Sequence, residues 1–264
     1  MLTLNCAPNA IFDSAEIVGA KATCLEGTQS HILGTIQDWA ENPDGQVIFW
    51  LHGMAGTGKT SVALTVANAL NERRPFTKGR KAPQATFLGA SFFFKQGDAS
   101  RNSTRAFFTT IARSLAQEYP DLKVRIVGAV QKNLETRSKA PQQQFDGLIY
   151  KPLLAVDEET LLPVRLIIVV DALDECVNRQ EVDELIGMLG VLERLHHVQL
   201  RVLITSRGDD HIHKSFYSLP EDVYRRSPLP KIKFSENEDG KDDITFYLKH
   251  TLRKIAQKHH VPQT

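Results

Sequence analysis

The sequence predicts an α/β fold in which helices cover both faces of a parallel sheet, and three observations support it. Short, almost wholly apolar runs recur along the chain, and segments with helical periodicity separate them. Polar, glycine-rich or acidic residues follow several of these runs at their carboxyl ends. Because parallel sheets bind ligands beyond the carboxyl ends of their strands, we expect the functional residues there.

The first half of the chain supplies two of the expected strands. Residues 1–22 show no clean periodicity and are expected to form a poorly structured arm. Residues 30–40 carry apolar side chains at helical spacing, and an Asn-Pro-Asp-Gly turn ends that helix. The run 46–51 (QVIFWL) suits a strand covered on both faces. An amphipathic helix over 59–72 then leads to the second strand, 86–94 (TFLGASFFF).

The second half of the chain holds three more expected strands. The third, 164–170 (VRLIIVV), follows a proline and ends at an acidic cluster. The fourth is 200–205 (LRVLIT), and a short fifth is 231–234 (KIKF). Further helices are expected from apolar residues at helical spacing over 104–117, 122–137, 144–155, 181–195 and 244–252.

Composition limits the class of protein. The 264 residues are 42% hydrophobic and 24% charged, as is usual for a globular chain with one core. A net charge of +1 gives no overall field that would attract nucleic acid or anionic lipid. No apolar run approaches the roughly 18 residues of a membrane helix, and three cysteines without a C-x-x-C pattern indicate a reducing compartment. We therefore expect a cytoplasmic protein without a membrane or nucleic-acid partner.

The most specific motif directly follows the first strand. It has the pattern G-x-x-x-x-G-K-T and consists of Gly53, Met54, Ala55, Gly56, Thr57, Gly58, Lys59 and Thr60. Its glycines let successive N–H groups point inward around phosphate oxygens, and the helix that follows adds its positive dipole end. Lys59 is expected to reach the β- and γ-phosphates of a nucleotide and the Thr60 hydroxyl to bind Mg²⁺, with Ser61 as a further candidate hydroxyl.

An acidic cluster ends the third strand. Asp171 stands at the strand tip, where a carboxylate can hold Mg²⁺ beside the phosphate loop. Asp174 and Glu175 are both candidates for orienting or deprotonating an attacking water. The alternative for these two acids is that they only begin the next helix, where negative charge is favourable.

The spacing of the motifs predicts the order of the strands. More than one hundred residues, including the second strand, separate Lys59 from Asp171. We therefore expect a three-layer α/β/α P-loop NTPase of the additional-strand type, with a five-stranded parallel sheet in the order 5-1-4-3-2. ATP is favoured over GTP, because Asp174 stands where GTPases have glycine and no N-K-x-D motif occurs.

Arg207 follows the fourth strand of this expected sheet. In the order 5-1-4-3-2 the carboxyl end of that strand faces the γ-phosphate, so Arg207 is expected to sense it. The alternative is a surface arginine at a helix start.

The three motifs together resemble the NACHT family of signal-transduction NTPases, also called STAND ATPases. They are GMAGTGKT (53–60), LIIVVDALDE (166–175) and LITSR (203–207). The upstream CLEGTQSHILGTIQDWA and the strand SFFFKQGD are most similar to fungal NACHT proteins and to the related nephrocystin-type N-terminal P-loop domain. The resemblance covers roughly residues 24–255.

The resemblance implies a nucleotide-controlled switch with ATP, ADP and Mg²⁺ as its ligands. ATP would replace ADP, the protein would then self-associate through an exposed surface, and slow hydrolysis would reset it. Residues 53–61 would hold phosphate and Asp171 the magnesium ion, with Asp174 and Glu175 serving hydrolysis and Arg207 sensing the γ-phosphate.

The resemblance also implies a domain division. Residues 23–234 would form the NACHT-like domain, and 235–264 a charged linker and helix. Family members continue into a winged helix and repeats, so we expect a fragment of a longer product or a reduced homologue. Two other functions stay open: a non-hydrolysing, nucleotide-clamped scaffold for protein partners, and a nucleic-acid-dependent ATPase, which the near-neutral charge disfavours.

Overall fold

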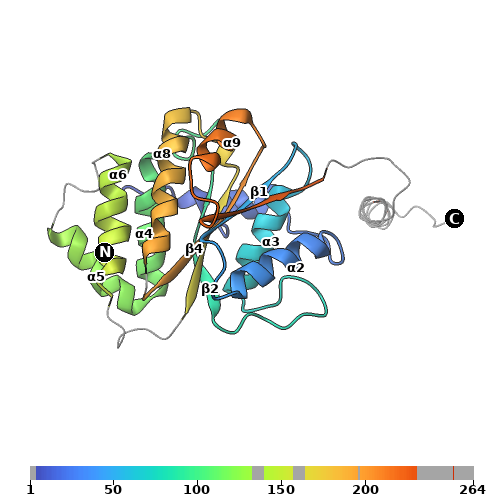
Figure 1. The fold of residues 1–264 in the computed structure, drawn as a ribbon, viewed down its shortest axis with the longest axis horizontal. Helices are drawn as coiled ribbons and strands as arrows, with labels where there is room; N and C mark the ends of the chain where they lie inside the picture. Colours follow the sequence, from blue (N-terminus) through green and yellow to red (C-terminus); the bar gives the residue numbers. More distant parts are fainter. Residues whose placement is uncertain (1–3, 133–139, 157–163, 196, 231–251, 253–264) are drawn as a thin grey trace.

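In the part of the chain that the structure describes, a five-stranded parallel sheet organises the fold. The computed structural model describes residues 4–132, 140–156, 164–195, 197–230 and 252. The strand order is β2-β3-β4-β1-β5, which confirms the predicted order 5-1-4-3-2 read from the opposite edge (Figure 1). The strands are β1 (Ile48–His52), β2 (Thr86–Phe93), β3 (Arg165–Asp171), β4 (Gln199–Ser206) and β5 (Tyr224–Pro228).

Helices cover both faces of the sheet and complete three layers. On one face lie α2 (Ser30–Glu41) and α3 (Lys59–Asn71) (Figure 1). The larger helices of the other face are α4 (Phe107–Glu118), α5 (Pro120–Lys132), α8 (Arg179–Gly190) and α9 (Asp210–Tyr217). The shorter elements are η1 (Pro8–Ala10), α1 (Ala15–Ala20), η2 (Thr104–Ala106), α6 (Pro141–Gln144), the π-helix η4 (Phe145–Tyr150), α7 (Lys151–Leu154), η5 (Leu173–Glu175) and η6 (Val191–Arg194).

The strands are apolar on both sides because both faces are covered. In β1, Ile48 and Trp50 belong to the core under α4 and α8, whereas Phe49 and Leu51 belong to the core under α2 and α3. All four side chains are fully buried. Alternate residues of a strand point to opposite faces, so an uninterrupted apolar run fills two cores at once.

The fifth strand does not lie where the sequence predicts it. The expected strand 231–234 falls outside the described residues, and the fifth strand is β5 instead. Among the described strands β5 pairs only with β1, and its sequence YRRSP is largely exposed. An edge strand open to water needs no apolar run, so the signal that marks the other four strands is absent here.

The expectation of a poorly structured arm over residues 1–22 is wrong for residues 4–22. This stretch forms η1 and α1, and the Ser14 hydroxyl caps α1 by accepting from the Ile17 N–H. Leu4, Ala7 and Ala10 are buried in the core of one face and Ile17 in the core of the other. The segment therefore passes from one face of the sheet to the other.

Most of the predicted helices are present, with shifted ends. The pattern over 144–155 is a continuous run of α6, η4 and α7, and the pattern over 181–195 is α8 followed by η6. The helix α9 was not predicted. The end of the helix expected over 122–137, the linker and helix expected over 235–264 and the helix expected over 244–252 lie outside the described residues, except for Leu252.

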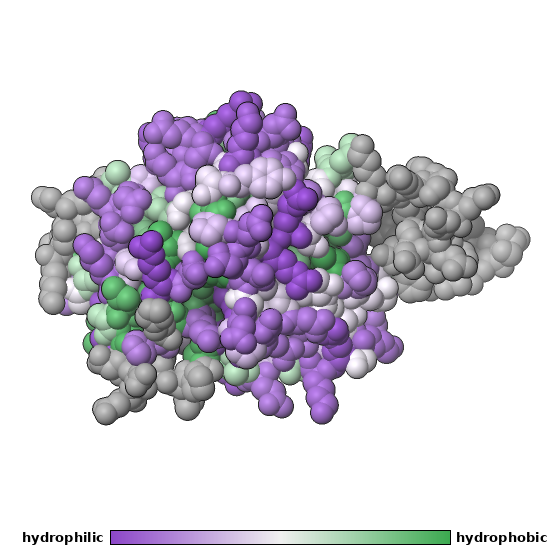
Figure 2. Space-filling model, in the orientation of Figure 1, coloured by the Kyte–Doolittle hydropathy of each residue, from purple (hydrophilic) through white to green (hydrophobic). Residues whose placement is uncertain are grey.

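Polar side chains dominate the outer surfaces of three of the helices (Figure 2). Figure 2 shows hydrophilic groups over α2, α8 and α9 on the face that it presents. Within the part of the chain that the structure describes, no helix has the length and apolar character needed to cross a membrane.

Candidate functional site

The glycine-rich loop joins the carboxyl end of β1 to the first turn of α3. Gly56 and Gly58 have φ angles of 79° and 91°, in the left-handed region that glycine adopts without steric cost. Met54, Ala55 and Gly56 are exposed. The loop thus forms an exposed turn at the N-terminus of a 13-residue helix, where unpaired N–H groups and the helix dipole favour an anion.

Lys59 begins α3 and folds back over this loop. Its ammonium donates to the carbonyl oxygens of Gly53 and Met54, each at 2.7 Å. Burial lowers the pKa of Lys59, and the carboxylates of Asp174 and Asp171 partly offset this. The ammonium therefore lies among the loop carbonyls, within the influence of Asp171 and Asp174.

Asp171 is the last residue of β3 and is fully buried. Its Oδ1 accepts a hydrogen bond from the Thr205 hydroxyl at 2.6 Å, and its Oδ2 accepts one from the Thr60 hydroxyl at 2.9 Å. Lys21 lies 3.5 Å from the same Oδ2. Residues from α3, β3, β4 and the segment after α1 thus converge on one carboxylate.

The chain turns sharply after Asp171. Ala172 has a φ of 57°, a conformation that is costly for a residue with a side chain, and its N–H donates to Thr205 Oγ1 at 3.0 Å. The turn leads into η5, which carries both acids of the predicted hydrolytic pair. The Thr205 hydroxyl therefore binds both the carboxylate of Asp171 and the backbone that redirects the chain.

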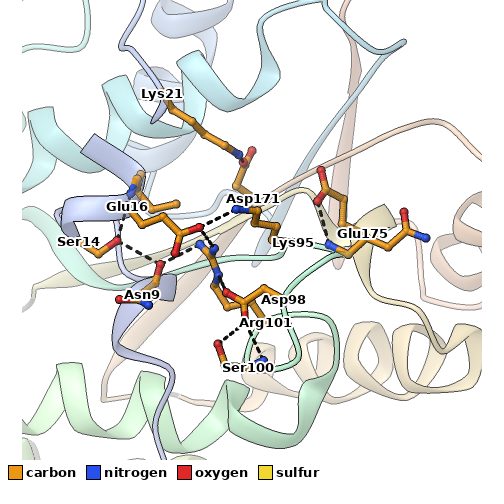
Figure 3. A network of polar contacts seen from close by, with 12 residues as sticks. Asn9, Ser14, Glu16, Lys21, Lys95, Asp98, Ser100, Arg101, Asp171 and Glu175 are labelled. Carbon is orange, nitrogen blue, oxygen red and sulfur yellow. Dashed lines mark hydrogen bonds and ion pairs between the residues drawn. The ribbon is translucent and has the colours of Figure 1, made fainter. Parts of the chain in front are cut away.

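Asp174 and Arg207 form a direct pair. Oδ1 of Asp174 accepts a hydrogen bond from the backbone N–H of Arg207 at 2.9 Å. Oδ2 of Asp174 lies 3.1 Å from Nε of the Arg207 side chain. The Asp174 side chain is only 9% exposed, whereas that of Arg207 is 57% exposed. Glu175 makes a different contact, because its Oε2 accepts from the Gln96 N–H at 3.1 Å (Figure 3).

A hollow of about 480 Å³ lies next to these acids, and no residue of the glycine-rich loop lines it. Asp174 and Glu175 belong to its wall. Cys176 also lines it, and burial raises the pKa of this thiol to about 11, so it stays protonated at neutral pH. The remaining lining residues are Gln96, Val177, Arg179, Asp209, Asp210 and His211.

The fold brings most of the predicted site residues together. Thr60 and Asp171 are in contact, Lys59 lies under the influence of Asp171 and Asp174, and Asp174 contacts Arg207. Ser61 is half-buried in the first turn of α3, next to Thr60. Among the described residues, no group of three or more His, Cys, Asp or Glu side chains could hold a metal ion.

Sequence reasoning missed three residues of this site. Lys21 lies in the segment expected to be unstructured and matches no motif. Gln96 contacts Glu175 through its backbone N–H, which any residue but proline carries. Thr205 stands at the polar end of the fourth strand, and its place in the sheet next to Asp171 was the signal that could have identified it.

These features define the chain as an α/β protein with a glycine-rich loop between β1 and α3. The buried carboxylate of Asp171, at the end of β3, lies beside this loop. The sequence profile of the family described as "Nephrocystin 3, N-terminal" matches residues 27–207. The chain therefore belongs to the nephrocystin 3 N-terminal family. No curated protein matches the chain.

Proposed function

We propose that the chain is a Mg²⁺-dependent, ATP-binding and slowly hydrolysing P-loop NTPase module of the signal-transduction type. One observation carries the proposal. The Thr60 hydroxyl and the Asp171 carboxylate meet at 2.9 Å directly beside the glycine-rich loop and Lys59. A loop suited to phosphate, an ammonium group and two oxygens that could bind a divalent ion thus lie together at the carboxyl ends of β1 and β3.

The residues of the loop fit the phosphates of a nucleoside triphosphate. The N–H groups of residues 53–61 and the dipole of α3 would hold phosphate oxygens. Lys59 would exchange its two carbonyl partners for phosphate oxygens. Because burial already removes part of the water around this half-buried ammonium, the exchange would replace neutral acceptors by charged ones at a reduced desolvation cost.

Thr60 and Asp171 fit a magnesium ion, since Mg²⁺ prefers hydroxyl and carboxylate oxygens and keeps several waters. When bound there, Mg²⁺ would neutralise negative charge on the phosphate oxygens. Asp171 is held for this role by Thr205 on its other oxygen, so the carboxylate has a fixed orientation.

Asp174 and Glu175 are the two candidates for the group that orients or deprotonates the attacking water. Glu175 is held through one oxygen by the Gln96 N–H. Asp174 is held on both oxygens by Arg207. If the Arg207 side chain leaves Asp174 to contact a γ-phosphate, Oδ2 of Asp174 would be freed, while the backbone N–H of Arg207 would keep Oδ1 in place.

This pairing also favours a second function, the non-hydrolysing clamp. If Arg207 keeps Asp174 occupied, bound nucleotide would only stabilise a surface that recruits protein partners. In either case we propose self-association on ATP binding and release after return to ADP, by analogy with the NACHT proteins that the motifs resemble.

Single-turnover hydrolysis of ATP separates the two functions. We expect Glu175→Gln or Asp174→Asn to slow hydrolysis by at least about a hundredfold, the usual effect of losing a general base. Asp210→Asn, which removes another acid from the wall of the same hollow, is the matched control and should hydrolyse normally. Rates that neither variant changes would support the clamp.

A further inference from the structure

Lys21 binds the carboxylate oxygen that the proposed magnesium site needs. Its Nζ lies 3.5 Å from Asp171 Oδ2, the oxygen that also accepts the Thr60 hydroxyl. The Lys21 ammonium also lies 6.0 Å from the centre of the Phe93 ring. The Asp171 side chain is 0% exposed and that of Lys21 30% exposed. A buried carboxylate needs a charged partner, and Lys21 supplies one.

We propose that Lys21 is a tethered counter-ion that stands in for the divalent cation and is displaced when Mg²⁺-nucleotide binds. This inference rests on the proposed function. Thr205 occupies Oδ1 of Asp171, so a cation shared with Thr60 must approach Oδ2. An ammonium and a divalent ion repel each other strongly when both lie against one oxygen in a poorly solvated site. Lys21 and Mg²⁺ therefore compete for Asp171.

Contacts with the rest of the fold hold the segment that carries Lys21. The Lys21 ammonium therefore stays close to Asp171 and competes with Mg²⁺ as an intramolecular partner. The Phe12 N–H donates to Ser91 Oγ of β2 at 2.9 Å. Glu16 of α1 forms ion pairs with Lys95 and with the buried Arg101. Figure 3 shows Glu16 between these two cations and the Lys21 side chain reaching from the same segment toward Asp171.

The same anchor connects the segment to the second acid. Lys95, which pairs with Glu16 at 2.6 Å, immediately precedes Gln96, whose N–H holds Glu175. The segment over residues 4–21 thus contacts Asp171 directly and reaches Glu175 through one loop. When Mg²⁺-nucleotide displaces Lys21, this segment would lose its contact with Asp171.

The test compares the Mg²⁺ concentration needed for binding of a fluorescent ATP analogue. We expect Lys21→Met to lower the Mg²⁺ midpoint about fivefold, the size expected when a partly exposed ion pair no longer competes. Lys78→Met is the matched control, because Lys78 pairs with Glu26 at the surface, with both side chains mostly exposed. This control should keep the wild-type midpoint.

A second variant covers the case in which Lys21→Met does not fold. Glu16→Gln leaves Lys21 in place but weakens its anchor, and we expect it to lower the midpoint about twofold. A separate readout uses the unmodified chain. Trypsin cleaves after lysine, so Mg²⁺-ATP should speed cleavage after Lys21 while it protects the folded core.

Each outcome bears on the proposal. A lower midpoint in Lys21→Met together with faster cleavage after Lys21 supports it. A higher midpoint, or weaker binding of the analogue, would overturn it by showing that Lys21 contacts the nucleotide. A midpoint equal to that of Lys78→Met would also overturn it. If the wild-type protein itself binds no Mg²⁺-ATP, the proposed function fails and this inference falls with it.

Discussion

The Thr60 hydroxyl donates a hydrogen bond to Asp171 at 2.9 Å although 111 positions separate the two residues. The sheet order explains the contact. β4 lies between β1 and β3, so the loop after β1 and the end of β3 approach each other across the end of β4. Thr205 of β4 donates a hydrogen bond to the other oxygen of Asp171 at 2.6 Å.

We expect Thr205→Val to destabilise the protein by about 2 kcal/mol. The variant keeps the shape of threonine but removes the hydroxyl that donates to Asp171 and accepts from the Ala172 N–H. Both groups would then be buried without this partner. Urea unfolding of the wild type and the variant measures the difference.

Thr205→Ser separates the contribution of the hydroxyl to stability from that of the methyl group. It keeps both hydrogen bonds and loses only one methyl group, so we expect a cost of about 1 kcal/mol. If the valine variant were as stable as the wild type, the hydroxyl would have no part in holding Asp171.

The strands that the sequence predicts correctly are those buried on both faces. The runs 48–51 in β1 and 166–170 in β3 are apolar because each of their residues enters one of two cores. β5 could not be found in this way, since as an edge strand it exposes Arg225 and Arg226 to water. The order of the strands followed from motif spacing and not from the strands themselves.

The parts of the site that carry a motif were predictable, and the parts that depend on packing were not. Lys59, Thr60 and Asp171 have fixed places relative to strand ends, so pattern alone indicates that they meet. Lys21 reaches Asp171 only because α1 packs on the sheet through Ile17. One buried isoleucine in a six-residue helix gives no periodicity to detect.

His52 should make stability depend on pH. Burial, followed by the charges of His213, Arg226 and Lys59, lowers the pKa of His52 to about 4. The unfolded chain has a histidine pKa near 6.5, so it binds more protons than the folded chain between these values. The contribution of neutral His52 is therefore complete above about pH 6.5 and is lost as the pH falls toward 4.

His52→Phe removes this titration and keeps a ring against Trp50, whose ring centre lies 4.6 Å from that of His52. We expect the fall in Tm between about pH 7.5 and pH 5 to shrink by about 2 °C, a modest value because His52 is partly exposed. His31→Gln changes an exposed histidine and should leave the fall unchanged. An equal fall in wild type and His52→Phe would show that His52 does not contribute.

Arg207→Gln should discriminate between nucleotides. If the guanidinium leaves Asp174 to contact a γ-phosphate, its loss should weaken ATP binding about tenfold and ADP binding by less than about twofold. Calorimetric titration with each nucleotide measures both affinities. Arg179→Gln, which changes an arginine that lines the adjoining hollow and has no contact with Asp174 among the described interactions, is the control. Equal losses for ATP and ADP in Arg207→Gln would exclude a role specific to the γ-phosphate.

The proposed function requires that the loop after β1 and Lys59 bind the phosphates of a nucleotide. Thermal unfolding of the wild type and of Lys59→Ala, with and without Mg²⁺-ATP, tests it most directly. At about 100 times its dissociation constant, a ligand of the folded state should stabilise the wild type by about 2.7 kcal/mol. We expect this gain in the wild type and little or none in Lys59→Ala. Equal stabilisation of both proteins, or of neither, would contradict the claim.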